Sequence, residues 1–335
     1  MDPLSQGVLG AAAPNSVAPP EHARLACLLG FLAGMAPDLD VFIRSPEDPL
    51  LFLEYHRQFT HALVFIPVGG FICGWLLHRL YAGRRGLSLR RSVLYCTLGY
   101  ATHALLDACT TYGTQLLWPF SDARFAWNTV SVIDPLFTLP ILLLVGIATW
   151  QRRALLARVA LAWAIAYPTL GALQRERAEA VGWELAAGRG HEPVRLEAKP
   201  SIANLLLWKV VYETADRYHV DAVRTGIDIT VYPGDSVPRL DVARDFPWLV
   251  PGSQQAIDIE RFRWFSNGYV AVEPGNPYRI TDIRYSMVPN EIRGLWSIEL
   301  SPGANNGDHV DYVVSRRADP RAMSAFQSML FHSIQ

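Results

Sequence analysis

Carboxylates and imidazoles recur at four places in stretches of the chain that are otherwise apolar. Ionisable groups in such stretches cost about 2.5–3.5 kcal/mol each on membrane-insertion scales, so their presence indicates a function. The groups are two aspartates two residues apart, two histidines five residues apart, a histidine and an aspartate four residues apart, and one aspartate before a proline: Asp38 and Asp40, His56 and His61, His103 and Asp107, and Asp134. Imidazole nitrogens and carboxylate oxygens are typical ligands of zinc, manganese and iron. The sequence therefore predicts a divalent metal site.

The spacing within each pair lets both side chains reach one site. Asp38 and Asp40 can face the same side of an extended turn after Pro37, and His103 and Asp107 share one face of a helix. More than four such ligands suggest two ions, which could activate a water and bind the oxygens of an ester. Each group alone also fits a plainer role: a capping turn, interface residues, a proton relay or buried pair, and a helix cap at Asp134. Their occurrence together favours the metal site.

Two arginines flank the predicted site. Arg57 and Arg124 carry guanidinium groups that suit a phosphate or carboxylate substrate, although arginines there could equally extend to lipid headgroups. The sequence contains no Gly-x-Ser-x-Gly, P-loop or His-Glu-x-x-His motif. Serine hydrolase, nucleotide-binding and standard metalloprotease functions therefore lack support.

The composition indicates that part of the chain lies in a membrane. Of 335 residues, 50% are hydrophobic and 18% are charged, against roughly 25% charged in an ordinary soluble domain. The 30 Lys and Arg residues balance 31 Asp and Glu residues, so no basic excess points to nucleic acid as the main partner. We expect membrane lipid to be the partner instead.

Four stretches approach the roughly 20 apolar residues that a transmembrane helix needs. They are residues 62–81, 92–111, 135–150 and 154–173. Residues 23–36 are also apolar but too short to span comfortably, and we expect a short N-terminal helix there. The N-terminus lacks the features of a cleaved signal peptide and is predicted to be retained.

The character of the sequence changes after about residue 173. A charged stretch, 174–199, is predicted to be a linker. From residue 200 to 335, alternating apolar and polar runs are separated by Pro, Gly, Asn and Asp, which is typical of strands and turns. The predicted fold is thus a helical membrane domain, residues 1–173, of about four transmembrane helices, followed by a soluble, mostly β domain.

The arginines in short loops predict the topology. Loops 82–91 and 151–153 hold four and two arginines, whereas 37–60 and 112–134 hold two and one. Because cytoplasmic loops are enriched in Lys and Arg, the first two loops should be cytoplasmic. The aspartates and histidines of the predicted metal site then all lie at the outer ends of their segments, and the β domain is extracytoplasmic.

The same residues resemble a known family. The chain is similar to membrane-bound metal-dependent hydrolases of the YbcI/YdjM type, closely over residues 1 to about 150. The similarity lies in Met1-Asp2-Pro3-Leu4, Gly7 to Ala12, Pro37-Asp38-Leu39-Asp40, His56-Arg57-Gln58-Phe59-Thr60-His61, Gly99 to Asp107, Tyr112-Gly113-Thr114-Gln115, Pro119-Phe120-Ser121 and Ile133-Asp134-Pro135. Residues 199–208 are similar to the start of the C-terminal extension in longer members. Many members have Thr-His where this chain has Ser5-Gln6.

The resemblance implies a site, a cofactor and a location. It implies a bacterial inner membrane protein that binds one or two divalent ions, with zinc favoured and manganese or iron as alternatives. Its implied ligands are Asp38, Asp40, His56, His61, His103 and Asp107, with Asp134 a weaker candidate. The family is also distantly similar to zinc-dependent phospholipases C and single-strand nucleases, which favours a phosphoester or lipid-linked substrate.

The leading functional prediction is therefore an enzyme, a hydrolase that uses a metal-activated water. Asp40 and Asp134 are the candidate general bases. A transporter or ion-conducting protein could use the same polar groups as a relay, although no repeat with broken helices is visible in the sequence. A non-catalytic membrane assembly factor, working through its β domain, is the third possibility.

Overall fold

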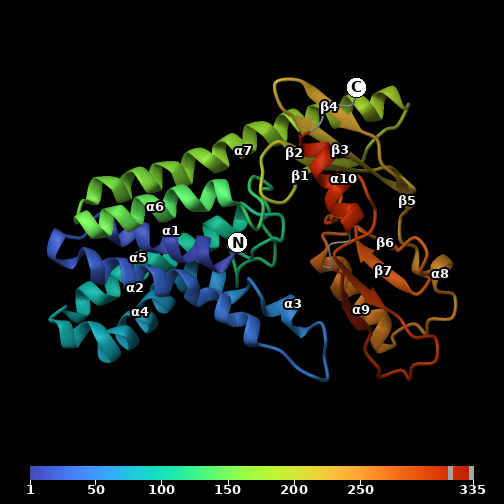
Figure 1. Cartoon of the computed structure of the whole chain (residues 1–335). Coiled ribbons are helices and arrows are strands. Elements are labelled where there is room, and N and C mark those ends of the chain that lie inside the picture. Colours follow the sequence, from blue (N-terminus) through green and yellow to red (C-terminus); the bar gives the residue numbers. More distant parts are fainter. Residues whose placement is uncertain (316–319, 332–335) are drawn as a thin grey trace. The chain divides into compact units, whose positions relative to one another are not determined.

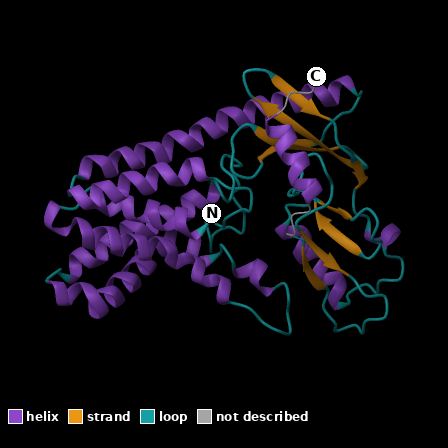
Figure 2. Ribbon diagram, viewed as in Figure 1, coloured by secondary structure: helices purple, strands orange, loops and turns teal. Residues whose placement is uncertain are grey.

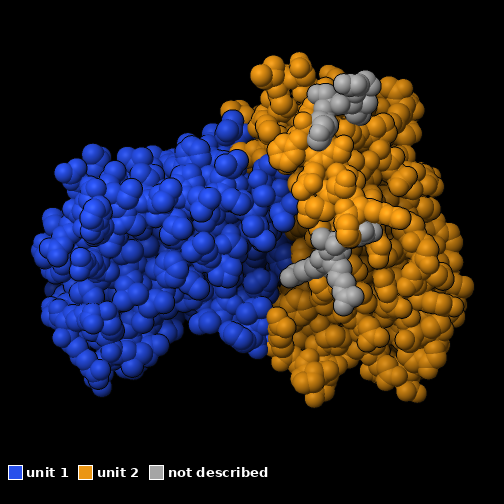
Figure 3. Space-filling model, viewed as in Figure 1, with its two compact units in different colours: residues 1–43, 55–172, 202–204 blue, residues 44–54, 173–201, 205–335 orange. Residues whose placement is uncertain are grey.

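The computed structural model describes residues 1–315 and 320–331, and its contacts divide the chain into two compact units (Figure 3). The helical unit contains residues 1–43, 55–172 and 202–204, and the β unit contains residues 44–54, 173–201 and 205–335. The main boundary, between residues 172 and 173, lies one residue before the predicted end of the membrane domain. The segment 44–54 falls inside that predicted domain but belongs to the β unit.

The helical unit is a bundle of long α-helices (Figures 1 and 2). These are α1 Pro3–Asn15, α2 Ala23–Met35, α4 Ile66–Leu77, α5 Leu89–Ala108, α6 Pro135–Gln151 and the first part of α7 Ala154–Gly188. Short 3-10 helices, Ala36–Phe42, Phe59–His61 and Leu63–Phe65, join α2 to α4 on either side of α3 Leu51–Tyr55. A π-helical turn, His78–Ala82, ends α4.

Among the residues that the structure describes, three helical segments are long and apolar enough to cross a membrane: Pro20–Phe42, Leu63–Arg85 and Ala154–Gly188. The last two correspond to the predicted spans 62–81 and 154–173. The first contains residues 23–36, which sequence reasoning judged too short, because 3-10 turns at both ends lengthen the helix to 23 residues. The predicted span 92–111 corresponds to α5, which has the length but carries arginines at its start and His103 and Asp107 at its end. Residues 135–151 form a shorter apolar helix, α6.

Helices α1, α2 and α5 approach one another closely at glycines. A Cβ atom on Gly99 would lie 2.5 Å from the carbonyl oxygen of Gly30, and one on Gly30 would lie 2.3 Å from that of Gly10. Small residues allow such backbone contact between membrane helices. One turn after Gly99, Nδ1 of His103 donates a hydrogen bond to the carbonyl oxygen of Gly34 at 2.6 Å. The glycine contact therefore also fixes where His103 lies.

We expect Gly99→Ala to weaken divalent metal binding by about tenfold, because the added methyl group must push α5 away from α2 and so move His103. Changes to groups that support a metal ligand typically cost about 10–100-fold in affinity. Gly146→Ala in α6 is the matched control, since a Cβ atom there has no neighbour within 4 Å. Isothermal titration of the two purified variants with zinc measures the difference. Equal affinities would show that the glycine contact does not position His103.

The stretch 174–199, which was predicted to be a linker, instead contains the end of a long helix and the start of the first strand. Helix α7 continues without interruption to Gly188, and the first strand begins at Arg195. The alanines, glutamates and arginines of this stretch favour helix, and one face of it is apolar. Ala178 and Val181 pack on the side chains of Trp208 and Val210. The charged residues that suggested a linker instead cover the solvent side of an amphipathic helix.

The β unit contains two antiparallel sheets, in agreement with the predicted mostly β domain. The first has the order β1-β2-β3-β4, with β5 also paired to β3, and the second has the order β6-β7-β8-β9. The strands are β1 Arg195–Pro200, β2 Leu207–Glu213, β3 Arg217–Thr225, β4 Ile229–Tyr232, β5 Ser236–Pro238, β6 Val270–Val272, β7 Arg279–Asp282, β8 Trp296–Glu299 and β9 Asp311–Val314. Helices α8 Val242–Asp245, α9 Gln254–Phe265 and α10 Pro320–Phe331 complete the unit. Side chains of both sheets, including Val211, Val220, Tyr269 and Ala271, share one buried cluster.

Candidate metal centre

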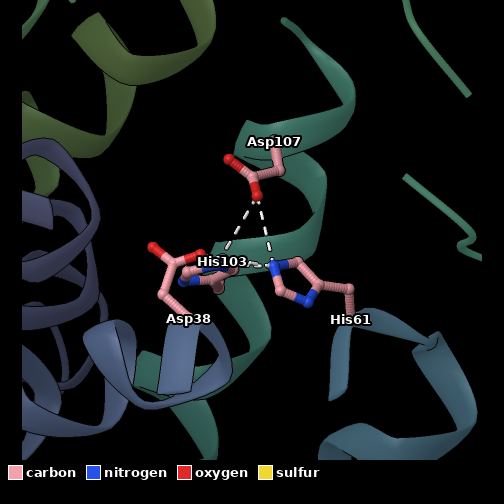
Figure 4. Close-up of side chains that lie close together, drawn as sticks. All are labelled: Asp38, His61, His103 and Asp107. Carbon is pink, nitrogen blue, oxygen red and sulfur yellow. Dashed lines mark hydrogen bonds and ion pairs between the residues drawn. The ribbon is translucent and has the colours of Figure 1, made fainter. Parts of the chain in front are cut away.

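Aspartates and histidines from three separate segments meet at one end of the helical unit. The 3-10 helix Ala36–Phe42, which continues α2, carries Asp38 and Asp40. His61 ends the 3-10 helix Phe59–His61, and the last turns of α5 carry His103 and Asp107. Figure 4 shows four of these side chains pointing toward a common point. The structure thus brings together residues that the sequence separates by up to 69 positions.

Four donor atoms form the first group: Oδ1 of Asp38, Nε2 of His61, Nε2 of His103 and Oδ2 of Asp107. The two Nε2 atoms lie 2.9 Å apart. Oδ1 of Asp38 lies 3.4 Å from Nε2 of His103 and 3.7 Å from that of His61, and the corresponding distances from Oδ2 of Asp107 are 3.6 and 3.2 Å. A tetrahedral ion with bonds of roughly 2.1 Å has ligand atoms about 3.4 Å apart. The five separations lie between 2.9 and 3.7 Å, on either side of that value, so these four atoms could hold one metal ion.

A second group shares one residue with the first. Asp38, Asp40 and His56 each offer a ligand atom, and these atoms lie within 4.8 Å of one another. Nδ1 of His56 and Oδ1 of Asp40 are 2.7 Å apart. All six predicted ligands thus belong to one of the two groups, and Asp38 belongs to both.

Hydrogen bonds orient the two histidines of the first group. A carbonyl oxygen only accepts, so the contact with Gly34 requires a proton on Nδ1 of His103. Nδ1 of His61 lies 3.2 Å from Oδ2 of Asp40, an arrangement that directs its Nε2 toward His103. The two Nε2 atoms face each other at 2.9 Å, a separation that allows either a hydrogen bond between them or a metal ion that both contact. The chemistry of this donor set therefore fits a bound metal ion.

Asp107 presents one oxygen to the site and uses the other for anchoring. Its Oδ1 accepts hydrogen bonds from Nε2 of Gln6, at 2.9 Å, and from the amino group of Met1. Its Oδ2 is fully buried and lies 2.9 Å from Nε of Arg57 and 3.2 Å from Nε2 of His61. The arginine offsets the charge of this oxygen, which also faces the imidazoles and could bind a metal ion there.

Arg57 lies inside the cluster and not on its outer surface. Only 4% of the residue is exposed, and its Nε is 2.9 Å from Oδ2 of Asp107. Its Nη1 donates to the hydroxyl of Thr110 at 2.9 Å. The carboxylate of Asp107 holds the charge of Arg57 in the interior, so Arg57 does not extend outward to headgroups, and its contact with a substrate stays a prediction.

Arg124 and Asp134 belong to neither group. Nη2 of Arg124 donates to the carbonyl oxygen of Gly113 at 3.0 Å, and its guanidinium lies 5.6 Å from the centre of the Tyr112 ring. Asp134 is the N-cap of α6 and accepts from the backbone N–H of Leu136 at 3.1 Å. Both of its oxygens also accept from the hydroxyl of Tyr167 at 2.9 Å. The structure thus gives Asp134 the capping role that its sequence context allowed, and not that of a ligand or general base.

Both carboxylate oxygens of Asp40 accept hydrogen bonds that orient neighbouring residues. Its Oδ2 accepts from the backbone N–H of Arg57 at 3.0 Å and from the hydroxyl of Thr60 at 2.7 Å. Its Oδ1 is paired with His56. Asp40 therefore supports His56 and His61, and its role as a general base stays a prediction.

Gln6 is a residue of the site that sequence reasoning did not select. It lies on α1, a helix absent from the predicted elements, and its Oε1 is buried without a hydrogen-bond donor in the described chain. The signal that could have found it is the position of Ser5-Gln6, where similar proteins have Thr-His. Histidine at that position would add a nitrogen donor, whereas Gln6 supplies an N–H to Asp107.

The helical bundle and its buried cluster define a membrane protein with a group of Asp and His side chains that could hold a metal ion. The sequence model of the YdjM inner membrane protein family matches residues 1–178, and the chain belongs to that family. This membership confirms the resemblance of the sequence to proteins of the YbcI/YdjM type.

Two curated relatives match parts of the chain. Inner membrane protein YbcI of Escherichia coli (strain K12) is 33% identical over 37% of this chain and 83% of its own length. The uncharacterized protein YfhP of Bacillus subtilis (strain 168) is 29% identical over 33% of this chain and 33% of its own length, so the match spans about a third of that protein. No solved structure matches the chain.

Proposed function

We propose that the protein is a metal-dependent hydrolase of the inner membrane that cleaves a phosphoester or lipid-linked substrate with water. The observation that supports this most directly is the first group of donor atoms, in which two imidazole nitrogens and two carboxylate oxygens meet closely enough to hold one metal ion. An ion bound there would act as a Lewis acid and lower the pKa of water toward about 7. Zinc is the ion that this mixture of nitrogen and oxygen donors favours, with manganese or iron as alternatives.

The charges of the cluster favour a divalent ion. Three aspartates, Asp38, Asp40 and Asp107, face two cationic groups in the cluster, Arg57 and the amino group of Met1. The negative charge that remains is costly in the interior unless a further cation offsets it. The first group would hold one ion, and the second group would hold another through Asp38, Asp40 and His56.

Apolar side chains around the accessible ligand favour a lipid-linked substrate. The side chain of Asp38 is 23% exposed, whereas those of His61, His103 and Asp107 are fully buried. Leu39 and Phe42, on the same 3-10 helix, are largely exposed. A substrate reaching Asp38 would therefore pass apolar side chains, which suits a phosphoester that carries acyl or prenyl chains.

Hydrolysis of a phosphodiester and phospholipid panel by the full chain in detergent tests this proposal. We expect turnover that requires zinc or manganese and is lost in Asp38→Asn, because that change removes a ligand shared by both groups. Asp122→Asn, in an exposed loop, is the control. Tight metal binding with no turnover of any ester in the panel would contradict the proposed hydrolase activity. Metal-dependent ion flux in proteoliposomes would then favour the transporter alternative.

We also propose that the site faces away from the cytoplasm. Arg90 and Arg91 begin α5, whereas His103 and Asp107 lie near its end, about 25 Å away at 1.5 Å per residue. Arg152 and Arg153 form the turn between α6 and α7. Cytoplasmic loops are enriched in arginine, and this supports a cytoplasmic position for the end of the bundle opposite the cluster.

Labelling with a membrane-impermeant maleimide should reach cysteine at Asp122 and at Ile227 in intact spheroplasts. Cysteine at Arg85 should react only after permeabilisation. All three positions are exposed, and the four native cysteines are first replaced by serine. The reverse pattern would place the site and the β unit in the cytoplasm. Such a result would exclude an extracytoplasmic substrate and leave the metal chemistry intact.

A further inference from the structure

One short segment joins the two parts of the chain that carry four of the six candidate ligands. Residues 44–54 follow Asp38 and Asp40 and precede His56 and His61. Although both flanking parts belong to the helical unit, the segment itself belongs to the β unit by its contacts. Its last residue, Glu54, is only two positions before His56. A contact that fixes the position of this segment therefore also restrains the candidate ligands on either side of it through the backbone.

Arg261 of α9 is the main polar anchor of this segment. Its Nη1 and Nη2 donate to the two carboxylate oxygens of Asp48 at 3.0 and 2.7 Å, and its Nε donates to Glu54. Such a two-bond pairing between guanidinium and carboxylate fixes orientation as well as distance. One side chain of the β unit thus holds both the middle and the end of the segment.

Apolar contacts support the same attachment. Leu50 and Leu53 are buried, and the ring of Phe52 meets the ring of Tyr312 edge to face with centroids 5.1 Å apart. The guanidinium of Arg44, at the start of the segment, lies 5.6 Å from the centre of the Phe52 ring. The segment is therefore attached to the β unit between Asp48 and Glu54, whereas Arg44, Pro46 and Glu47 are exposed.

A fully buried carboxylate holds Arg261 in place. Oδ1 of Asp258 accepts from Nη1 of Arg261 at 2.8 Å, and its Oδ2 accepts from Nδ1 of His309 at 2.8 Å and from the backbone N–H of Val310. Arg261 therefore lies among three carboxylates, those of Asp48, Glu54 and Asp258. Without the guanidinium these groups would repel one another, and the segment would lose its attachment.

Hydrogen bonding from Arg261 also stabilises the charged form of Asp48. Partial burial raises the pKa of this carboxyl, but the hydrogen bonds from Arg261 and from the backbone N–H of Leu50, together with the charge of Arg261, outweigh it, and the pKa is lowered below the usual value. The attachment is therefore fully ionised at neutral pH.

We propose that Arg261 is a positioning residue for the metal centre, through which the β unit fixes the spacing between the Asp38–Asp40 and His56–His61 segments. The inference rests on the proposed metal centre and extends it to a residue about 200 positions away in the sequence. Its effect should be strongest on the second group, because Glu54 is so close to His56 and His56 is paired with Asp40. The C-terminal extension would thereby control how tightly the ion is held.

Cobalt binding by the full chain in detergent tests this role, since the visible spectrum of Co²⁺ reports its coordination as well as its affinity. We expect Arg261→Gln to weaken Co²⁺ binding about 10–100-fold, the usual effect of losing support for a ligand, and to alter the visible bands. Arg261→Lys keeps the charge and should restore part of the affinity. Arg244→Gln is the control, since the exposed Arg244 pairs with its neighbour Asp245 in the same unit.

A second variant keeps the test independent of folding. Asp48→Asn leaves Arg261 and its bond to Asp258 in place and should weaken Co²⁺ binding in the same direction. If both variants retain the wild-type circular dichroism, affinity and spectrum, the positioning role is wrong although the metal centre stands. If the wild-type protein binds no Co²⁺, Zn²⁺ or Mn²⁺, the metal centre itself fails and this inference fails with it.

Discussion

Replacing His61 with alanine should lower divalent metal affinity by at least about 100-fold, whereas replacing His78 should leave it within a factor of about two. His61 is buried, and its Nε2 lies within 3.7 Å of three other donor atoms. His78 lies in the π-helical turn that ends α4, with Nδ1 3.2 Å from the hydroxyl of Ser92. Loss of a direct ligand should exceed the 10–100-fold cost typical of supporting groups.

The two substitutions form a matched pair because both remove an imidazole, one just before the helical segment Leu63–Arg85 and one in its later turns. Metal content of purified protein by mass spectrometry and competitive titration with a zinc indicator measure the result. Equal losses in both variants would mean that the His61 effect arises from folding. The assignment of His61 as a ligand would then be withdrawn.

The cluster was predictable because polar groups in apolar helices are costly. Asp38, His61, His103 and Asp107 stand out for that reason, and the arginine bias predicted that they share one end of the bundle. Their convergence in the structure follows from the same constraint, because ionisable groups that are buried away from water are stabilised when they lie close to one another.

Residues whose partners are distant in sequence could not be assigned in the same way. Asp134 before Pro135 fits both a helix cap and a ligand, and the bond from Tyr167, 33 positions later, decides in favour of the cap. Arg57 fits both a surface cation and a buried counter-ion, and Asp107, 50 positions later, determines which it is. The sequence immediately around Asp134 and Arg57 includes neither of these partners, Tyr167 and Asp107.

Helix α1 was not predicted because few features of its sequence favour a helix. It contains two glycines, Gly7 and Gly10, and a proline, Pro14, near its end, and all three residues lower its helix propensity. Contact with α2 and α5 at glycine backbones compensates for this. Gln6 reaches Asp107 only because that contact exists, so the missing helix and the missing site residue have the same origin.

Asp107→Asn should both remove the metal and destabilise the protein, because Asp107 serves as a candidate ligand and as the buried partner of Arg57. Removing one member of a buried ion pair typically costs about 3–5 kcal/mol, since the remaining charge is left uncompensated. Urea unfolding in detergent measures the stability, and titration with zinc measures the binding. The variant alone cannot separate the two roles, since an unstable protein also binds metal poorly.

The double variant Arg57→Met with Asp107→Asn separates them. Methionine fills much of the volume of the arginine stem without its charge, so the unpaired cation of the single variant is gone and most of the lost stability should return. Metal affinity should stay at least about 100-fold below that of the wild type, since the carboxylate that completes the first group is still missing. A double variant that binds zinc like the wild type would exclude Asp107 as a ligand. One that stays as unstable as Asp107→Asn would instead show that the Arg57 charge is not what Asp107 stabilises in the folded protein.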